Sequence, residues 1–211
     1  MSKEIVRGNT VIIEFNAEKC VHSRHCVLDR PDVFVPNVEG EWIRPDAATA
    51  DEVVALARNC PSGAIVARRL DRGRNEAAPL VNAVRVLENG PLAVHAELSV
   101  RGAPAGFRAT LCRCGQSRHK PYCDGSHVTA GFTATGEPPV TESTPLPSRA
   151  GPVEVTPTPN GPLKFTGPVE VISGTGHTLN RGAEFYFCRC GQSKTKPYCD
   201  GTHKALGFIA D

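Results

Sequence analysis

The chain has 211 residues, with 24 basic and 22 acidic side chains and a net charge of +2, so we expect no nucleic acid or charged membrane surface among its partners. Apolar residues make up 40%, and 20 glycines and 18 prolines indicate many turns, which favours two or three small domains over one large core. No apolar run approaches the roughly 20 residues of a spanning helix, and the first ten residues lack the apolar core of a signal peptide. We therefore expect a cytoplasmic protein whose nine cysteines bind metal rather than form disulfides.

The first 67 residues predict a small α+β unit. Its expected strands are residues 10–15, 40–43 and 64–67. Residues 20–26 predict a loop, since Cys20 and Cys26 would have to converge on one point. Pro31 leaves room for only a short helical turn before it.

One helix is predicted in this unit, behind a capping box formed by Thr49 and Glu52. The apolar residues at positions 53, 54, 56 and 57 give it one buried stripe. It should end at the pair Cys60-Pro61. The charged residues 68–79 have no periodicity and predict a linker.

From residue 80 the chain is β-rich and its pattern occurs twice. Apolar residues alternate on both sides of Asn89-Gly90, a favourable hairpin pair, and Asn160-Gly161 repeats this turn 71 positions later. The cysteines repeat 76 positions later, so the second copy should carry five extra residues, which we expect around positions 174–176. Seven prolines between residues 133 and 159 predict an extended connection without helix.

The repeat contains the run CRCGQSRHKPYCDGSH at residues 112–127 and CRCGQSKTKPYCDGTH at residues 188–203. Each copy offers three thiols and one imidazole as Cys-x-Cys-x8-Cys-x3-His. A helical turn over residues 123–127, capped by Asp124, would place Cys123 and His127 on one face. Two pairs of ligands suit the two irons of a cluster, and they also suit a single tetrahedral zinc, so the spacing leaves both open.

Nine positions in each copy resemble the signature of the CDGSH iron–sulfur, or mitoNEET-like, family. They are Cys112, Cys114, Ser117, Pro121, Cys123, Asp124, Gly125, Ser126 and His127, and Cys188, Cys190, Ser193, Pro197, Cys199, Asp200, Gly201, Thr202 and His203. The resemblance implies a [2Fe–2S] cluster in each copy, with the first two cysteines on one iron and the third cysteine and the histidine on the other. Because single-motif members pair around a shared β-cradle, it also implies an intramolecular pseudo-dimer here.

The N-terminal cysteines resemble, less specifically, a divergent single-cluster bacterial ferredoxin domain. Cys20, Cys26 and Cys60 match the first, third and fourth ligands of the run Cys-x2-Cys-x2-Cys…Cys-Pro, and Ser23 stands at the second. This resemblance implies a [3Fe–4S] cluster, or a [4Fe–4S] cluster whose fourth iron has a weaker ligand. The near candidates for that ligand are His22, Ser23 and His25. Three unligated buried cysteines are the purely structural alternative.

Together these patterns predict an α+β chain with three domains. The first is a small ferredoxin-like domain over residues 1–70, and two β-rich CDGSH domains follow over residues 80–135 and 152–211. The two CDGSH domains are expected to form the pseudo-dimer around a shared β-cradle. Whether the whole chain is monomeric or pairs with itself stays open.

The favoured function is electron transfer between redox partner proteins, through two [2Fe–2S] clusters and one ferredoxin-type cluster. The alternative is a cluster carrier or redox and pH sensor that passes its cluster to an apo-acceptor protein when His127 or His203 is protonated. A zinc-stabilised interaction module is the third hypothesis. Since no nucleophile–base pair, phosphate-binding loop or substrate-pocket motif is visible, we expect no enzymatic activity.

Overall fold

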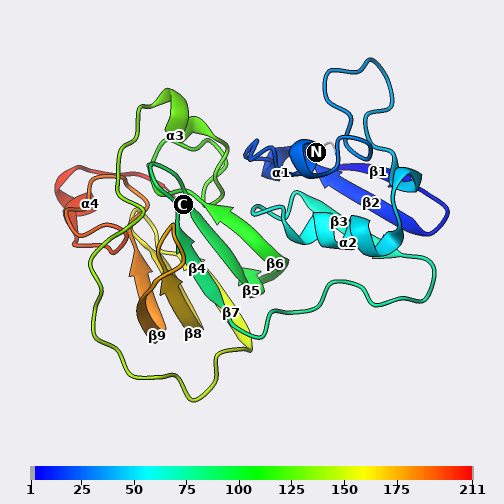
Figure 1. Cartoon of the computed structure of the whole chain (residues 1–211). Helices are drawn as coiled ribbons and strands as arrows, with labels where there is room; N and C mark the ends of the chain where they lie inside the picture. Colours follow the sequence, from blue (N-terminus) through cyan, green and yellow to red (C-terminus); the bar gives the residue numbers. More distant parts are fainter. Residues whose placement is uncertain (1–2, 211) are drawn as a thin grey trace. The chain divides into compact units, whose positions relative to one another are not determined.

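The computed structural model describes residues 3–210 and divides the chain into two compact units, with the boundary between Ala77 and Ala78 (Figure 1). Every helix in this part of the chain is too short and too polar to cross a membrane. Both CDGSH-type repeats lie in the second unit, so the domain limits predicted within it stay predictions.

The first unit is a three-stranded antiparallel sheet with a helix packed on it. Its elements are β1 (Lys3–Arg7), β2 (Val11–Asn16), the 3-10 turn η1 (Ala17–Lys19), α1 (His25–Asp29), the 3-10 turn η2 (Pro45–Ala47), α2 (Ala50–Arg58) and β3 (Ile65–Arg69). Strand β2 is central, between β1 and β3. Alternate residues of β2 and β3, such as Val11, Ile13 and Ile65, share a core with the buried stripe of α2.

The structure bears out most of the expected elements of this unit and corrects two. The strands expected at residues 10–15 and 64–67 are present as β2 and β3. The strand expected at residues 40–43 is wrong, because only an isolated bridge joins Phe34 to Ile43. Turn residues with positive φ, among them Gly40 at 92°, confine the pairing to that point. Strand β1 was not expected, since it is exposed and charged.

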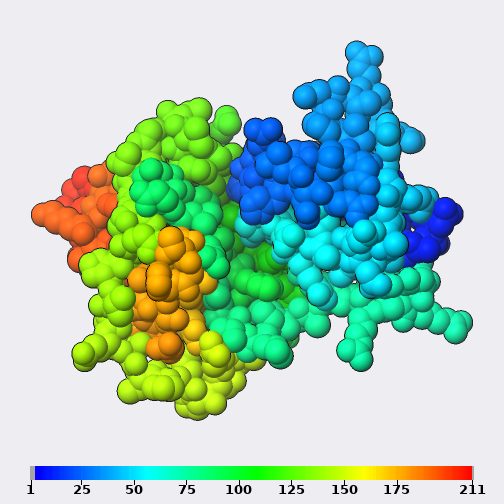
Figure 2. All heavy atoms as spheres, viewed as in Figure 1, coloured from blue at the N-terminus to red at the C-terminus, as the bar shows by residue number. Residues whose placement is uncertain are grey.

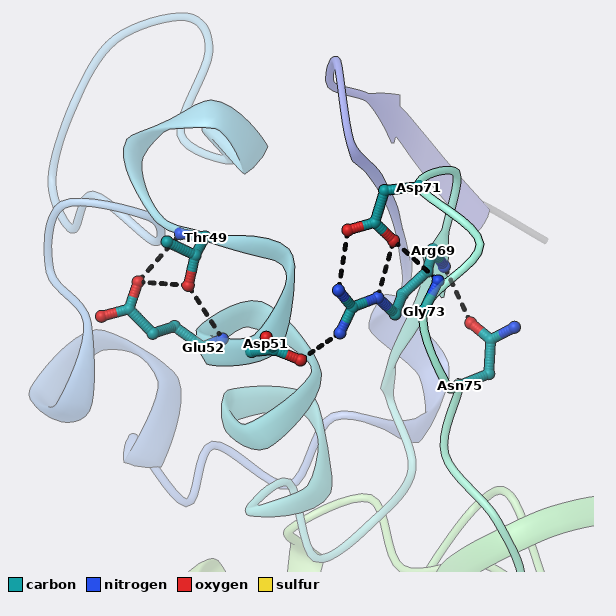
Figure 3. A network of polar contacts seen from close by, with 7 residues as sticks. All are labelled: Thr49, Asp51, Glu52, Arg69, Asp71, Gly73 and Asn75. Atoms are coloured by element: carbon teal, nitrogen blue, oxygen red, sulfur yellow. Dashed lines mark hydrogen bonds and ion pairs between the residues drawn. The ribbon is translucent and has the colours of Figure 1, made fainter.

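The start of α2 is tied to the end of β3 by a polar network (Figure 3). Thr49 and Glu52 form the predicted capping box, in which the Glu52 carboxylate accepts the Thr49 N–H at 2.8 Å. The Arg69 guanidinium binds Asp71 through two bonds of 2.8 and 2.7 Å and also contacts Asp51. The first residues of the predicted linker are therefore folded onto the unit and fix the N-terminal end of α2.

The second unit is a six-stranded β-structure built from the two repeats. Its elements are β4 (Ala83–Val86), β5 (Leu92–Val100), β6 (Ala103–Leu111), α3 (Ser126–Thr129), β7 (Pro152–Pro157), β8 (Leu163–Ile172), β9 (Thr178–Phe187) and α4 (Thr202–Ala205). In each repeat three strands run antiparallel, in the order β4-β5-β6 and β7-β8-β9. Buried side chains of both repeats form one continuous core.

The two repeats exchange strand pairings. Strand β4 pairs antiparallel with its own β5 and parallel with β8 of the other repeat, and β7 pairs antiparallel with its own β8 and parallel with β5. The two parallel pairings have the same register. Ala83 of β4 pairs with Glu170 of β8, and Glu154 of β7, which lies 71 positions after Ala83, pairs with Ser99 of β5, which lies 71 positions before Glu170. The repeats are thus related by an approximate twofold operation through the sheet.

The five extra residues of the second repeat lie where they were expected. The β5–β6 hairpin turns at Arg101 and Gly102, whereas the β8–β9 hairpin has a longer loop at residues 173–177 and slightly longer strands. The connection at residues 130–151 has no helix, as predicted, and runs along the outside of the sheet (Figure 1). Its yellow-green atoms border the orange atoms of the second hairpin in Figure 2, where the Thr141 N–H donates to the Leu179 carbonyl at 2.8 Å.

Candidate metal centres

Each motif begins where the last strand of its repeat ends. Strand β6 leads into Cys112, whose N–H donates to the Pro121 carbonyl at 2.8 Å, and the Cys123 N–H donates to the Thr110 carbonyl at 2.9 Å. The chain therefore returns beside the strand end and brings the third cysteine back to the first. The second copy repeats this return after β9, with the Cys188 N–H bonded to the Pro197 carbonyl at 2.8 Å.

The predicted ligands of each copy meet as two pairs. In the first copy the Cys112 and Cys114 sulfurs are 3.7 Å apart, and the Cys123 sulfur lies 3.4 Å from Nδ1 of His127. In the second copy the corresponding distances are 3.6 Å and 3.3 Å. They belong to the pairs Cys188/Cys190 and Cys199/His203. Within residues 3–210 no three His, Cys, Asp or Glu side chains converge as they would around one metal ion.

Burial and hydrogen bonding set the protonation of these groups. The Cys114 thiol and nearby backbone N–H groups hydrogen-bond to Cys112, which lowers the pKa of Cys112 to about 6 although the residue is fully buried, and the shared bond raises the pKa of Cys114. Burial raises the pKa of Cys123 to about 11 and lowers the pKa of His127. Metal binds the thiolate form of cysteine, and Cys112 is the cysteine of this copy whose surroundings already favour that form.

The Asp-Gly pair of the motif shapes the loop rather than starting a helix at Cys123. Asp124 accepts the Ser126 N–H at 3.0 Å and the Arg118 N–H at 2.9 Å, Gly125 has φ of 86°, and α3 begins only at Ser126. The predicted helical turn over residues 123–127 is therefore wrong in its start, although Cys123 and His127 still meet. The Gly125 N–H also donates to the Cys123 sulfur at 3.5 Å.

A buried arginine stands between the first two cysteines of each motif, and the sequence reasoning missed it. Arg113 is 1% exposed and donates to the carbonyls of Gly90, Thr135, Leu87 and Ala134 at 2.6–3.2 Å. Burial lowers the pKa of Arg113 to about 10, and the negative charges of Glu88 and Cys188 oppose that shift. Arg189 is equally buried and binds the carbonyls of Gly161, Thr158 and Ala210 at 2.7–3.1 Å.

The two motif loops approach each other so closely that only glycine fits at the point of contact. A Cβ on Gly115 would lie 2.6 Å from the Cys190 carbonyl oxygen, and one on Gly191 would lie 2.4 Å from that of Cys114. Both glycines have positive φ, at 82° and 83°. The backbones of the two motif loops are therefore in direct contact just after Cys114 and Cys190.

The three N-terminal cysteines line one cavity of about 420 Å³. Cys20 follows η1, Cys60 follows α2, and Cys26 lies in the first turn of α1, so the loop expected at residues 20–26 ends before Cys26. Burial raises the pKa of Cys20 and of Cys26, and the charge of the nearby Cys60 raises both further. Three mutually interacting thiols facing one cavity are a donor set that fits an iron–sulfur cluster.

The three centres bring together cysteine and histidine side chains, which are residue types that bind metal. Residues 89–128 and 160–204 match the family described as iron-binding zinc finger CDGSH type, and residues 6–69 match the family described as divergent 4Fe-4S mono-cluster. The chain thus combines two CDGSH segments with an N-terminal segment of the 4Fe-4S mono-cluster type, which confirms both resemblances. No curated protein and no solved structure gave a significant match.

Proposed function

We propose that this iron–sulfur protein holds three clusters and carries single electrons between partner proteins, as an electron carrier rather than an enzyme. The observation that carries the proposal is the geometry of the two motif centres. Each centre has two pairs of candidate ligands, and the loop that carries them contacts the loop of the other copy at Gly115 and Gly191. In this account each copy holds a [2Fe–2S] cluster, and Cys20, Cys26 and Cys60 hold a [3Fe–4S] or [4Fe–4S] cluster. Such clusters, when bound, accept and return one electron.

We further propose that the second unit is the intramolecular counterpart of a CDGSH homodimer. The parallel pairings of β4 with β8 and of β5 with β7 support this, because each repeat contributes strands to the other. The reciprocal fit of Gly115 and Gly191 is the second support. The shared β-structure would then be the cradle beneath the two centres.

The protein's own residues favour the reduced state of these centres. A neutral imidazole in place of a fourth thiolate removes one negative charge from each ligand set. The buried Arg113 and Arg189 add positive charge beside the cysteines, and backbone N–H groups such as that of Gly201 donate to ligand sulfurs, here to Cys199 at 3.4 Å. Each of these features should raise the reduction potential above that of an all-cysteine plant-type centre.

The experiment is a potentiometric titration of the purified full-length protein, followed by visible absorbance and electron paramagnetic resonance. We expect reversible one-electron reduction, and the variant His203→Cys should lower the potential of one centre because it restores a thiolate. A colourless protein containing zinc would contradict the proposal and favour the interaction module.

Cluster transfer is the second candidate, and the exposure of the histidines supports it. His127 and His203 are partly exposed, whereas Cys112, Cys114 and Cys188 are buried. The histidine of each copy is therefore the side from which an acceptor protein could take the cluster. Incubation with an apo-ferredoxin tests this: transfer that His203→Cys slows would favour the carrier, and clusters that stay in place would favour electron transfer.

A further inference from the structure

The N-terminal centre has three cysteines, whereas a [4Fe–4S] cluster takes one protein ligand on each of its four irons, so one ligand is missing. We propose that the imidazole of His22 is the fourth ligand, so that all three centres of the chain use three cysteines and one histidine. This inference rests on the proposed function, because it requires a cluster at Cys20, Cys26 and Cys60.

The cavity of about 420 Å³ limits the choice of ligand. Besides the three cysteines, the loop residues His22, Ser23 and Arg24 line it. Its remaining wall is largely apolar, with Phe15, Trp42 and Ile65 among the lining residues, and an apolar wall protects a cluster from water. Ser62 also lines the cavity, but its hydroxyl accepts the Ala64 N–H at 3.3 Å and lies 3.6 Å from the Cys60 sulfur. The polar side chains left for a fourth ligand are therefore those of residues 22–24.

His25 is removed from the candidates by its position. Its Nδ1 lies 2.9 Å from the Asn59 carbonyl oxygen, at the C-terminal end of α2, and the residue does not line the cavity. The Nδ1 contact leaves Nε2 free, so it is the position of His25 outside the cavity wall that removes it from the candidates. Arg24 offers only N–H donors and cannot bind a cation.

Between the two remaining residues, chemistry favours His22. A neutral imidazole has a free lone pair and is a common iron ligand, whereas a serine hydroxyl must lose its proton to bind iron strongly. His22 is only two residues from Cys20, and both residues line the cavity. Among residues 3–210 no hydrogen-bond partner is found for the His22 ring.

The backbone of the loop gives a second and independent reason. His22 and Arg24 have φ of 53° and 64°, a left-handed conformation that is strained for a residue with a side chain. Such strain persists where something compensates it, and it clusters at ligand-binding loops. A bond from His22 to the cluster would be that compensation.

The test compares His22→Ala with the neighbouring variants Ser23→Ala and His25→Ala in the full-length protein. Electron paramagnetic resonance of the oxidised protein is the readout, because [3Fe–4S] centres give a signal there and [2Fe–2S] and [4Fe–4S] centres do not. We expect a silent wild type, a [3Fe–4S] signal with loss of about one iron per chain in His22→Ala, and no change in the two neighbouring variants. If His22→Ala loses the whole centre, His22→Cys decides, since cysteine can bind iron: recovery of about four irons at this centre supports the proposal, and no recovery overturns it.

Two other results would overturn the inference and leave the proposed function intact. One is a [3Fe–4S] signal already present in the wild type and unchanged in His22→Ala, which means that no fourth ligand exists. The other is loss of iron in Ser23→Ala instead of His22→Ala. An N-terminal centre without any iron in the wild type would instead contradict the proposed function itself.

Discussion

The two CDGSH centres and the N-terminal centre use similar ligands but hold them in opposite ways. In the motif loops, Asp124 accepts backbone N–H groups of the loop itself, and Arg113 ties the loop to the carbonyls of Leu87 and Gly90 in the preceding hairpin. In the N-terminal loop, Cys20 is followed by residues in a left-handed conformation that face a cavity. The difference teaches that side chains of the CDGSH motif other than its cysteines order the motif loop, whereas the N-terminal loop has the two left-handed residues His22 and Arg24 in its backbone.

The largest expected effect comes from removing a buried arginine. Arg113→Met should lower the free energy of unfolding by about 3–5 kcal/mol, because four carbonyls lose their donor inside the protein. Arg118→Met is the matched control from the same loop, since its side chain is 88% exposed, and it should cost less than about 0.5 kcal/mol. Denaturant unfolding of both loaded variants measures the difference, and equal values would show that the buried arginine does not hold the loop.

The contact between the two motif loops gives the next effect. Gly115→Ala should cost about 2–4 kcal/mol, because it adds a clash with the Cys190 carbonyl to the strain of a positive φ. Gly125→Ala is the control, since its φ of 86° is similar but nothing lies within 4 Å of the added Cβ, and it should cost about 1–2 kcal/mol. If thermal unfolding gave the same loss of stability for both variants, the close contact between Gly115 and the Cys190 carbonyl would be contradicted.

The carboxylate that orders each motif loop should have a smaller effect. Burial raises the pKa of Asp124, but hydrogen bonds from Ser126 and the Arg118 N–H outweigh it and lower this pKa to about 2. Asp124→Asn removes the charge and one acceptor, and we expect a loss of about 1–2 kcal/mol at neutral pH. This stabilisation is complete above the unfolded pKa of about 3.9 and is lost as the pH falls through about 2, so the loss should disappear in acid. If the free energies of unfolding of Asp124→Asn and wild type still differed below about pH 2, the stabilising role of the Asp124 carboxylate would be contradicted.

The smallest effect is expected in the N-terminal unit, and it tests whether that unit folds independently of the two CDGSH centres. Thr49→Ala breaks the capping box of α2 and should cost about 1 kcal/mol, while the spectra of the two CDGSH centres stay unchanged. Thr144 is exposed in the connection at residues 130–151, and Thr144→Ala should leave the free energy of unfolding unchanged. A change in the CDGSH spectra of Thr49→Ala would show that the two regions are coupled.

The centres could be predicted from the sequence because their geometry is local. The pairs Cys112/Cys114 and Cys123/His127 lie within sixteen residues and are closed by hydrogen bonds inside the same loop. The strand exchange between repeats could not be predicted, since the parallel pairing of β4 with β8 depends on how two distant segments pack. Arg113 was missed for a related reason: a charged residue predicts a surface position, and here distant carbonyls bury it.

The central claim is that three thiol-rich centres each hold an iron–sulfur cluster, two of them of the [2Fe–2S] type. Iron and acid-labile sulfide analysis combined with Mössbauer spectroscopy of the full-length protein tests it most directly. We expect about seven or eight irons and about eight sulfides per chain, with four of the irons in [2Fe–2S] centres and the rest in one [3Fe–4S] or [4Fe–4S] centre. Zinc in place of iron at the motif cysteines, or iron without sulfide, would contradict it.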